Sequence, residues 1–182
     1  MPAGSLPARF ASGGLWLPLA AVPIAFVAVL ASPPGPGTVP LLYLAAVTPA
    51  LWVADITERR LPNRLVLPAY PVLAIALALQ WAVSGGLPLV ALVSGLGYFA
   101  LMLVLSAAGG IGMGDVKLAG ALGFSAGMFG VDAALASPLL AFLAGGVAAT
   151  ITLLAARGRR GTRIPFGPFM LAGFWAAVLL PL

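Results

Sequence analysis

The sequence predicts an all-α fold, a bundle of transmembrane helices that forms one membrane-embedded domain over residues 1–182. Two observations lead to this prediction. The chain is 62% hydrophobic and only 7% charged, whereas soluble domains are about 25% charged. Its apolar residues also gather in runs, and a run of about 20 is enough to cross the hydrocarbon core of a bilayer.

Seven apolar runs follow one another along the chain, and each predicts a helix. Stretches with Ser, Pro and Gly mark the breaks at 32–38, 84–88 and 136–138. The run at 116–131 is short enough to be re-entrant, which leaves six spanning helices as the alternative. The runs lie at 14–31, 39–54, 65–83, 87–108, 116–131, 133–156 and 165–182.

The cations predict which way the bundle crosses the membrane. If the N-terminus is cytoplasmic, all nine Lys and Arg residues lie on the cytoplasmic side, as the positive-inside rule requires. The loops on the opposite side then contain no Lys or Arg, and their only charged residue is Asp132. This pattern also favours seven helices over six. The first run, with one Arg before it, fits a signal peptide as well. The cations are Arg9, then Arg59, Arg60 and Arg64, then Lys117, then Arg157, Arg159, Arg160 and Arg163.

Composition also limits the chemistry. The chain has no Cys and no His, which excludes a thiol nucleophile, a Ser-His-Asp triad and the usual zinc sites. We expect no metal and no cofactor. The high pI does not come from a basic helix or an aromatic-interleaved basic patch, so we expect no nucleic-acid partner. The hydrolytic chemistries that remain are a carboxylate pair and a Ser-Lys dyad.

Asp55 and Asp115 are the candidate carboxylate pair. Both lie at the predicted cytoplasmic ends of apolar runs, so they share one depth and one side of the membrane. An acid there is costly unless it is paired or faces water. Two adjacent carboxyls can share a proton, so that one activates water while the other donates to a peptide carbonyl. Glycines before Asp115 leave room for a substrate chain.

Other interpretations stay open at this point. Lys117 either holds Asp115 ionised or contacts lipid phosphate, and a dyad of Lys117 with Ser106 or Ser125 is the rival hydrolytic site. A small transporter, or a proton or cation relay using Asp55 and Asp115, is the alternative from another class of protein, although such a site favours acids near the midplane of the membrane.

Other polar and small residues have structural interpretations. We expect Glu58 and Asp132 to be loop acids. Small residues at Gly123, Gly127, Gly145 and Gly146 are expected to serve helix packing.

Taken together, three segments resemble the type IV prepilin peptidases, membrane aspartic peptidases of the Gly-x-Gly-Asp class. The first segment runs from Asp55 through Glu58-Arg-Arg-Leu to Pro62 and Asn63. The second is Gly112-Met-Gly-Asp-Val-Lys-Leu118, followed by Leu122-Gly123, and the third is Ile164-Pro-Phe-Gly-Pro-Phe169. The resemblance covers about residues 40–180. A presenilin-like protease fits less well, since no Pro-Ala-Leu step follows Asp115.

The resemblance implies a concrete function. Members remove a short basic leader from pilin-like precursors at the cytoplasmic face of the bacterial inner membrane. By motif match, Asp55 and Asp115 are the catalytic aspartates, and Gly112, Gly114, Lys117, Pro62 and Asn63 support them. Arg59, Arg60 and Arg64 are expected to shape the access of substrate or to bind anionic membrane lipid. Larger members carry an N-terminal Cys-x-x-Cys segment linked to N-methylation. Because this chain has no Cys, we expect a compact, peptidase-only protein without a separate methyltransferase segment.

Overall fold

The structure is a computed structural model that describes residues 16–31, 34–155 and 165–180. Over these residues the chain is helical and contains no strand, which confirms the all-α prediction. Seven helices of 13 or more residues are present, and a short one, α4, lies between the second and third of them. The helices are α2 (Trp16–Ala31), α3 (Thr38–Glu58), α4 (Asn63–Val66), α5 (Ala69–Ser84), α6 (Leu89–Ala107), α7 (Met113–Gly127), α8 (Val131–Ala155) and α9 (Gly167–Leu179).

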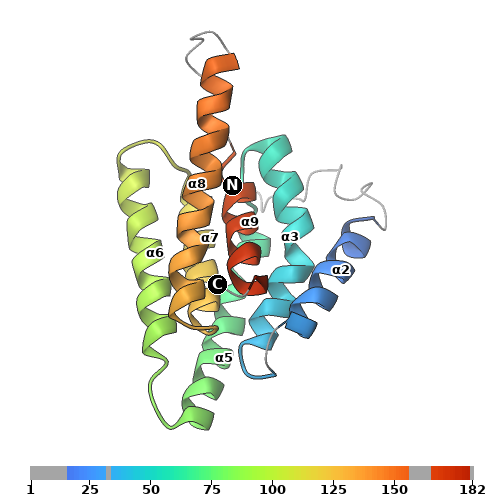
Figure 1. The fold of residues 1–182 in the computed structure, drawn as a ribbon, viewed down its shortest axis with the longest axis vertical. Coiled ribbons are helices and arrows are strands. Elements are labelled where there is room, and N and C mark those ends of the chain that lie inside the picture. Colours follow the sequence, from blue (N-terminus) through green and yellow to red (C-terminus); the bar gives the residue numbers. More distant parts are fainter. Residues whose placement is uncertain (1–15, 32–33, 156–164, 181–182) are drawn as a thin grey trace, which may run out of the picture.

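Helix α7 is the centre of the bundle, and Figure 1 shows α6, α8 and α9 arranged around it. Its sequence is rich in Gly and Ala, so neighbouring backbones approach it closely. A Cβ at Gly123 would lie 2.7 Å from the Ser94 carbonyl oxygen of α6, and Gly127 lies directly against Ala91 and Ser94. The packing role predicted for Gly123 and Gly127 is therefore confirmed.

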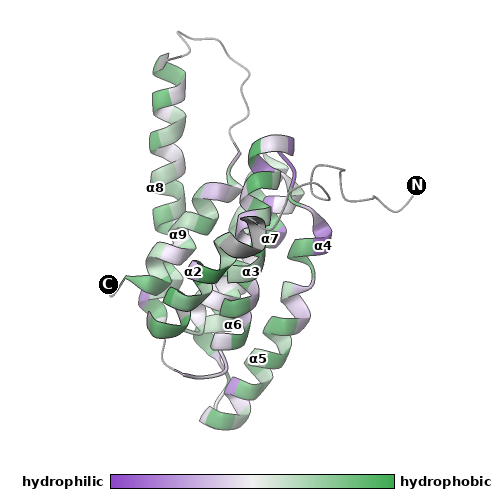
Figure 2. Cartoon of the chain, turned by 90° about the vertical axis from the view of Figure 1, so that its right-hand side faces the viewer, coloured by the Kyte–Doolittle hydropathy of each residue, from purple (hydrophilic) through white to green (hydrophobic). Residues whose placement is uncertain are grey.

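In the part of the chain that the structure describes, four helical segments are long and apolar enough to cross a membrane, judged by length and composition: Thr38–Glu58, Asn63–Ser84, Leu89–Ala107 and Val131–Leu154. Figure 2 shows these helices mostly in hydrophobic colours, with hydrophilic colours at the end of α3 and around α4. Many large apolar side chains point outward, among them Leu103, Val104 and Leu154. Such a surface suits lipid rather than water.

The boundaries differ from the predicted runs in two places, and one predicted packing contact is absent. Pro138 lies inside α8, so the break predicted at 136–138 is wrong, and the chain turns instead near Gly130, whose φ is +119°. Helix α7 begins at Met113, three residues before the predicted run 116–131, so Asp115 lies inside the helix. A Cβ at Gly146 would meet nothing within 4 Å, so the close packing predicted there is wrong, whereas a Cβ at Gly145 would lie 2.7 Å from the Phe166 ring. Arg9 and the four arginines at 157–163 lie outside the described residues.

Two hydrogen bonds join α9 to α3 and set the height of α9 in the bundle. The Trp175 Nε1 donates to the Thr48 Oγ1 at 3.0 Å in the core. About two turns further along, the Gly167 N–H donates to the Asp55 carboxylate. Buried polar groups need such partners in a dry interior. The pair of bonds thus brings the start of α9 level with Asp55.

Candidate active site

Asp55 lies in the last turn of α3 and is almost fully buried, with 4% of its surface exposed. Its Oδ2 accepts a hydrogen bond of 2.8 Å from the backbone N–H of Gly167, the first residue of α9. The N-terminus of a helix carries partial positive charge, which favours an anion at that place. Helix α9 therefore stabilises the ionised form of Asp55.

Asp115 lies in the first turn of α7, outside the four candidate membrane spans. Its Oδ2 accepts from the Gly112 N–H at 3.3 Å, as the third residue of a helix does when it supports the N-cap. Its Oδ1 is buried and has no hydrogen-bond partner among the described residues. A buried, charged carboxylate oxygen without a hydrogen-bond partner is unfavourable, and protonation removes that charge. The surroundings of Oδ1 therefore favour the protonated form of Asp115.

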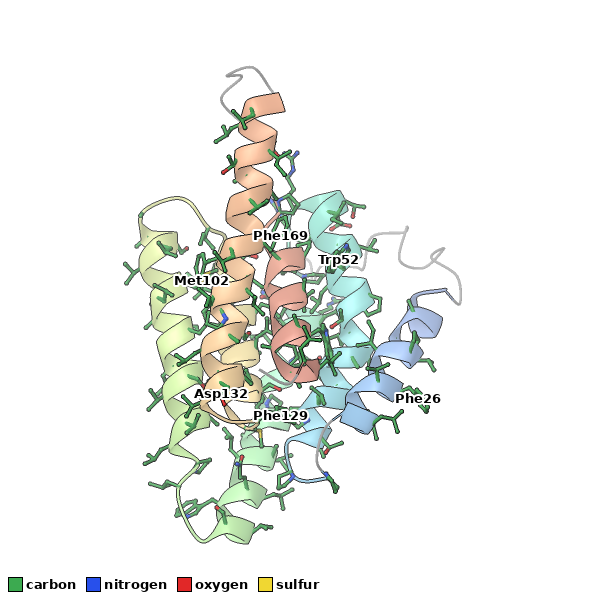
Figure 3. The ribbon with its side chains drawn as sticks, viewed as in Figure 1. Phe26, Trp52, Met102, Phe129, Asp132 and Phe169 are labelled. Carbon is green, nitrogen blue, oxygen red and sulfur yellow. The ribbon has the colours of Figure 1, made fainter. Side chains whose placement is uncertain are left out.

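The two aspartates line one pocket of about 150 Å³ at the end of the bundle where α3 ends and α7 and α9 begin. Asp132 lies at the opposite end, as Figure 3 shows. One wall of the pocket is the glycine-rich turn before α7, which presents mostly backbone. The full lining is Asp55, Arg59, Gly109, Gly110, Ile111, Gly112, Asp115, Pro165 and Phe166.

The electrostatics of the pocket separate the two carboxyls. Burial raises the pKa of Asp115 from an ordinary 3.8 to about 6, the charge of Asp55 adds to the increase, and the Gly112 N–H opposes it. Like charges at short range resist double ionisation. Asp55 has a backbone donor and a helix N-terminus for its charge, so a single proton in this pocket is favoured on Asp115.

Leu61 fills the space beside the pocket and explains two glycines. A Cβ at Gly114 would lie 3.0 Å from the Leu61 Cβ and 3.5 Å from its backbone N and O. At Gly167 a Cβ would lie 2.8 Å from the Asp55 Oδ2 and 3.4 Å from the Leu61 Cδ2. Only glycine lets the starts of α7 and α9 come this close to Asp55 and Leu61.

The other motif residues lie around this contact. Pro62 is the N-cap of α4 and Asn63 is its first residue. Gly112 is the N-cap of α7 and lines the pocket. The Lys117 Nζ donates to the Asn63 Oδ1 at 3.1 Å, so the ammonium is bound neither to Asp115 nor to a serine. The Ser106 hydroxyl donates to the Ile111 carbonyl, and the buried Ser125 hydroxyl has no hydrogen-bond partner among the described residues, so neither serine of the rival dyad is bonded to Lys117.

Sequence reasoning did not select several residues of the pocket. Gly167 and Phe166 stand in the third motif, which was the available signal, but nothing local shows that Gly167 contacts a residue 112 positions away. Arg59, in contrast, was expected to shape the access of substrate or to bind lipid, and it lines the pocket in a left-handed conformation with φ +51°. Over the described ranges, we find no group of three His, Asp or Glu side chains placed to bind a metal ion.

Together these features define a helical bundle of membrane-protein type with two carboxyls in one pocket. Comparison with family models matches residues 41–154 to the type IV leader peptidase family. The chain belongs to this family, as the resemblance of its motifs predicted.

Relatives in this comparison carry the name prepilin leader peptidase/N-methyltransferase. The protein of Aeromonas salmonicida (strain A449) is 31% identical over 162 residues, which are 86% of this chain and 54% of that protein. The Aeromonas hydrophila protein is 32% identical over 152 residues, 80% of this chain and 51% of that protein. The chain thus spans about half the length of these relatives. No solved structure matches it significantly.

Proposed function

We propose that this protein is a membrane aspartic peptidase that removes the short basic leader from pilin-like precursors. The observation that carries the proposal is the pairing of Asp55 and Asp115, 60 positions apart, in one pocket of a bundle from the type IV leader peptidase family. The names of the Aeromonas relatives, which are prepilin leader peptidases, support the same substrate class.

The two aspartates have different roles in this proposal. Asp55, held ionised by the Gly167 N–H, takes a proton from a water molecule, whose oxygen adds to the scissile carbonyl carbon. Asp115 gives its proton to the carbonyl oxygen. The proton held by Asp55 then passes to the leaving nitrogen as the C–N bond breaks, and one hydroxyl of the tetrahedral intermediate returns its proton to Asp115 as the carbonyl re-forms. Separate environments for two carboxyls are the usual basis of such a division.

The glycine-rich turn offers a path for an extended substrate chain. Gly109, Gly110 and Gly112 line the pocket without side chains, so a peptide backbone can approach the carboxyls closely. Phe166 forms an apolar wall, packed against Phe142 with ring centroids 5.3 Å apart. An extended peptide thus fits between a backbone wall and an aromatic wall.

We propose that the pocket opens to the cytoplasm, in a multi-pass protein of the bacterial inner membrane. Support comes from Arg59, Arg60, Arg64 and Lys117, which lie at the same end of the bundle as the two aspartates. Under the positive-inside rule that end is cytoplasmic. Basic side chains there also suit the anionic headgroups of membrane lipid.

The test is cleavage of a pilin-like precursor in membranes that contain equal amounts of wild type, Asp55→Asn, Asp115→Asn or Asp132→Asn. Asp132 is an exposed acid at the far end of the bundle and serves as the matched control. We expect each pocket variant to lose at least 1,000-fold in cleavage rate, because both carboxyls act as one unit. The control retains the wild-type rate. Cleavage that persists in either pocket variant contradicts the proposal.

A further inference from the structure

The segment between α3 and α5 is attached to α7 by contacts that lie outside the pocket. The Lys117 Nζ donates to the Asn63 side-chain oxygen at 3.1 Å. The Tyr70 hydroxyl donates to the backbone carbonyl of Lys117 at 2.8 Å. Leu61 lies against Gly114, one turn before Lys117 on the same face of α7. Three contacts therefore join residues 61–70 to one face of α7.

Asp115 lies next to this face, and the attached segment continues directly from Asp55. Only five residues separate Asp55 from Leu61, and Leu61 is wedged against both Gly114 and the Gly167 that binds Asp55. A shift of Leu61 therefore changes the position of α7 relative to α3 and α9. The distance between the Asp55 and Asp115 carboxyls therefore depends on the position of Leu61.

Among the described residues, no hydrogen bond joins Lys117 to either carboxyl, since the two aspartates accept from Gly167 and Gly112. Lys117 is the only lysine of the chain, and its ammonium is bound to Asn63. Its side chain is therefore connected to the site through the segment that it holds.

We infer that Lys117 is a positioning residue whose hydrogen bond to Asn63 holds Leu61 between Gly114 and Gly167 and thereby sets the separation of Asp55 and Asp115. Only the kinetic test of this inference rests on the proposed peptidase function. Lys117 and Asn63 belong to two different motifs, and in this inference they have the same role, which is to hold Leu61 in place.

The kinetic test compares Lys117→Met, Asn63→Ala and the double variant in leader cleavage. A displacement of about 1 Å in reacting groups costs as much as 100-fold in rate, so we expect kcat to fall about 10- to 100-fold in each single variant. KM changes little, because neither side chain lines the pocket. The double variant is no slower than the slower single variant, since both remove one bond.

A conservative substitution separates positioning from simple stability. Asn63→Asp keeps an acceptor oxygen for Lys117, and we expect it to recover most of the kcat that Asn63→Ala loses. A rise in KM in Lys117→Met, with no effect of Asn63→Ala, would mean that Lys117 binds substrate or lipid, and this overturns the inference.

A second readout does not depend on peptidase activity. Because the chain has no Cys, Asp55→Cys and Asp115→Cys can be combined and cross-linked with a short bifunctional thiol reagent. Adding Lys117→Met is expected to slow this cross-linking several-fold. If wild type does not cleave a precursor but cross-linking still slows on Lys117→Met, the positioning role stands and the proposed function fails. An unchanged cross-linking rate together with an unchanged kcat overturns the positioning role.

Discussion

At the scale of single residues, Asp115 carries two opposing effects on one carboxyl. The Gly112 N–H and the start of α7 favour its charge, whereas burial and the neighbouring Asp55 disfavour it. The second pair of effects is larger, so the pKa lies above its ordinary value. Sites that work by proton transfer commonly accept such a cost in stability.

This balance gives a prediction about pH. Because the folded-state pKa is about 6 and the ordinary value is 3.8, the stability that protonated Asp115 contributes is complete below about pH 4. It is lost as the pH rises through about 6. Asp115→Asn has no such titration, and it is expected to melt at a higher temperature than wild type above pH 6 and at a similar temperature near pH 4. Thermal unfolding in detergent across this range measures the difference.

Asp132→Asn is the control for that measurement. Asp132 is exposed at the first turn of α8, and its substitution should leave the pH dependence of the melting temperature as it is in wild type. Identical pH profiles for wild type and Asp115→Asn would mean that Asp115 is not protonated more readily in the folded protein.

At the scale of helices, glycines determine how closely the elements pack. A Cβ at Gly173 of α9 would lie 2.6 Å from the Ala141 N and 2.7 Å from the Ser137 O of α8. Backbone atoms cannot turn aside as a side chain can, so the two helices would have to separate. This contact matters for the pocket because α9 also carries Gly167.

We therefore predict that Gly173→Ala destabilises the protein by about 1–3 kcal/mol, as overpacking does, and lowers the melting temperature. Gly146→Ala in α8 is the matched control, because a Cβ there meets nothing within 4 Å. In that variant Ala replaces Gly inside a helix, which favours the helix by up to about 1 kcal/mol. Equal stability of the two variants would contradict the close α8–α9 packing.

At the scale of the whole molecule, the bundle has two chemically different ends. The pocket, Arg59, Arg60, Arg64 and Lys117 lie at one end, and Asp132 lies at the other (Figure 3). Seven crossings from a cytoplasmic N-terminus would put the first of these ends in the cytoplasm. The orientation remains a prediction, and a labelling experiment can test it directly.

Single cysteines make the topology measurable, since the native chain contains none. We expect Gly86→Cys and Asp132→Cys to react with a membrane-impermeant thiol reagent in intact spheroplasts. Arg60→Cys is expected to react only after the membrane is permeabilised. All three positions are exposed in the structure, so a lack of reaction reports sidedness rather than burial. The reverse pattern would reverse the orientation and place the pocket outside the cytoplasm.

The sequence alone was sufficient to predict much of this protein. Lipid requires a helix to satisfy its own backbone hydrogen bonds, so apolar runs of sufficient length already indicate an all-α bundle. The short motifs around Asp55 and Asp115 indicated the family. The placement of both residues at the ends of runs also led to the expectation that they share one end of the bundle.

Only the tertiary structure determined how the pocket is built. The contact of Gly167 with Asp55, the wedge of Leu61 against Gly114 and the bond from Lys117 to Asn63 each join residues more than 50 positions apart. Local hydropathy and propensity carry no information about such distances. The continuation of α8 through Pro138 likewise depends on neighbours that stabilise a helix with one missing hydrogen bond. The sequence thus determined which segments are helices and which residues are candidates, because both follow from local chemistry. Long-range packing decided which groups meet.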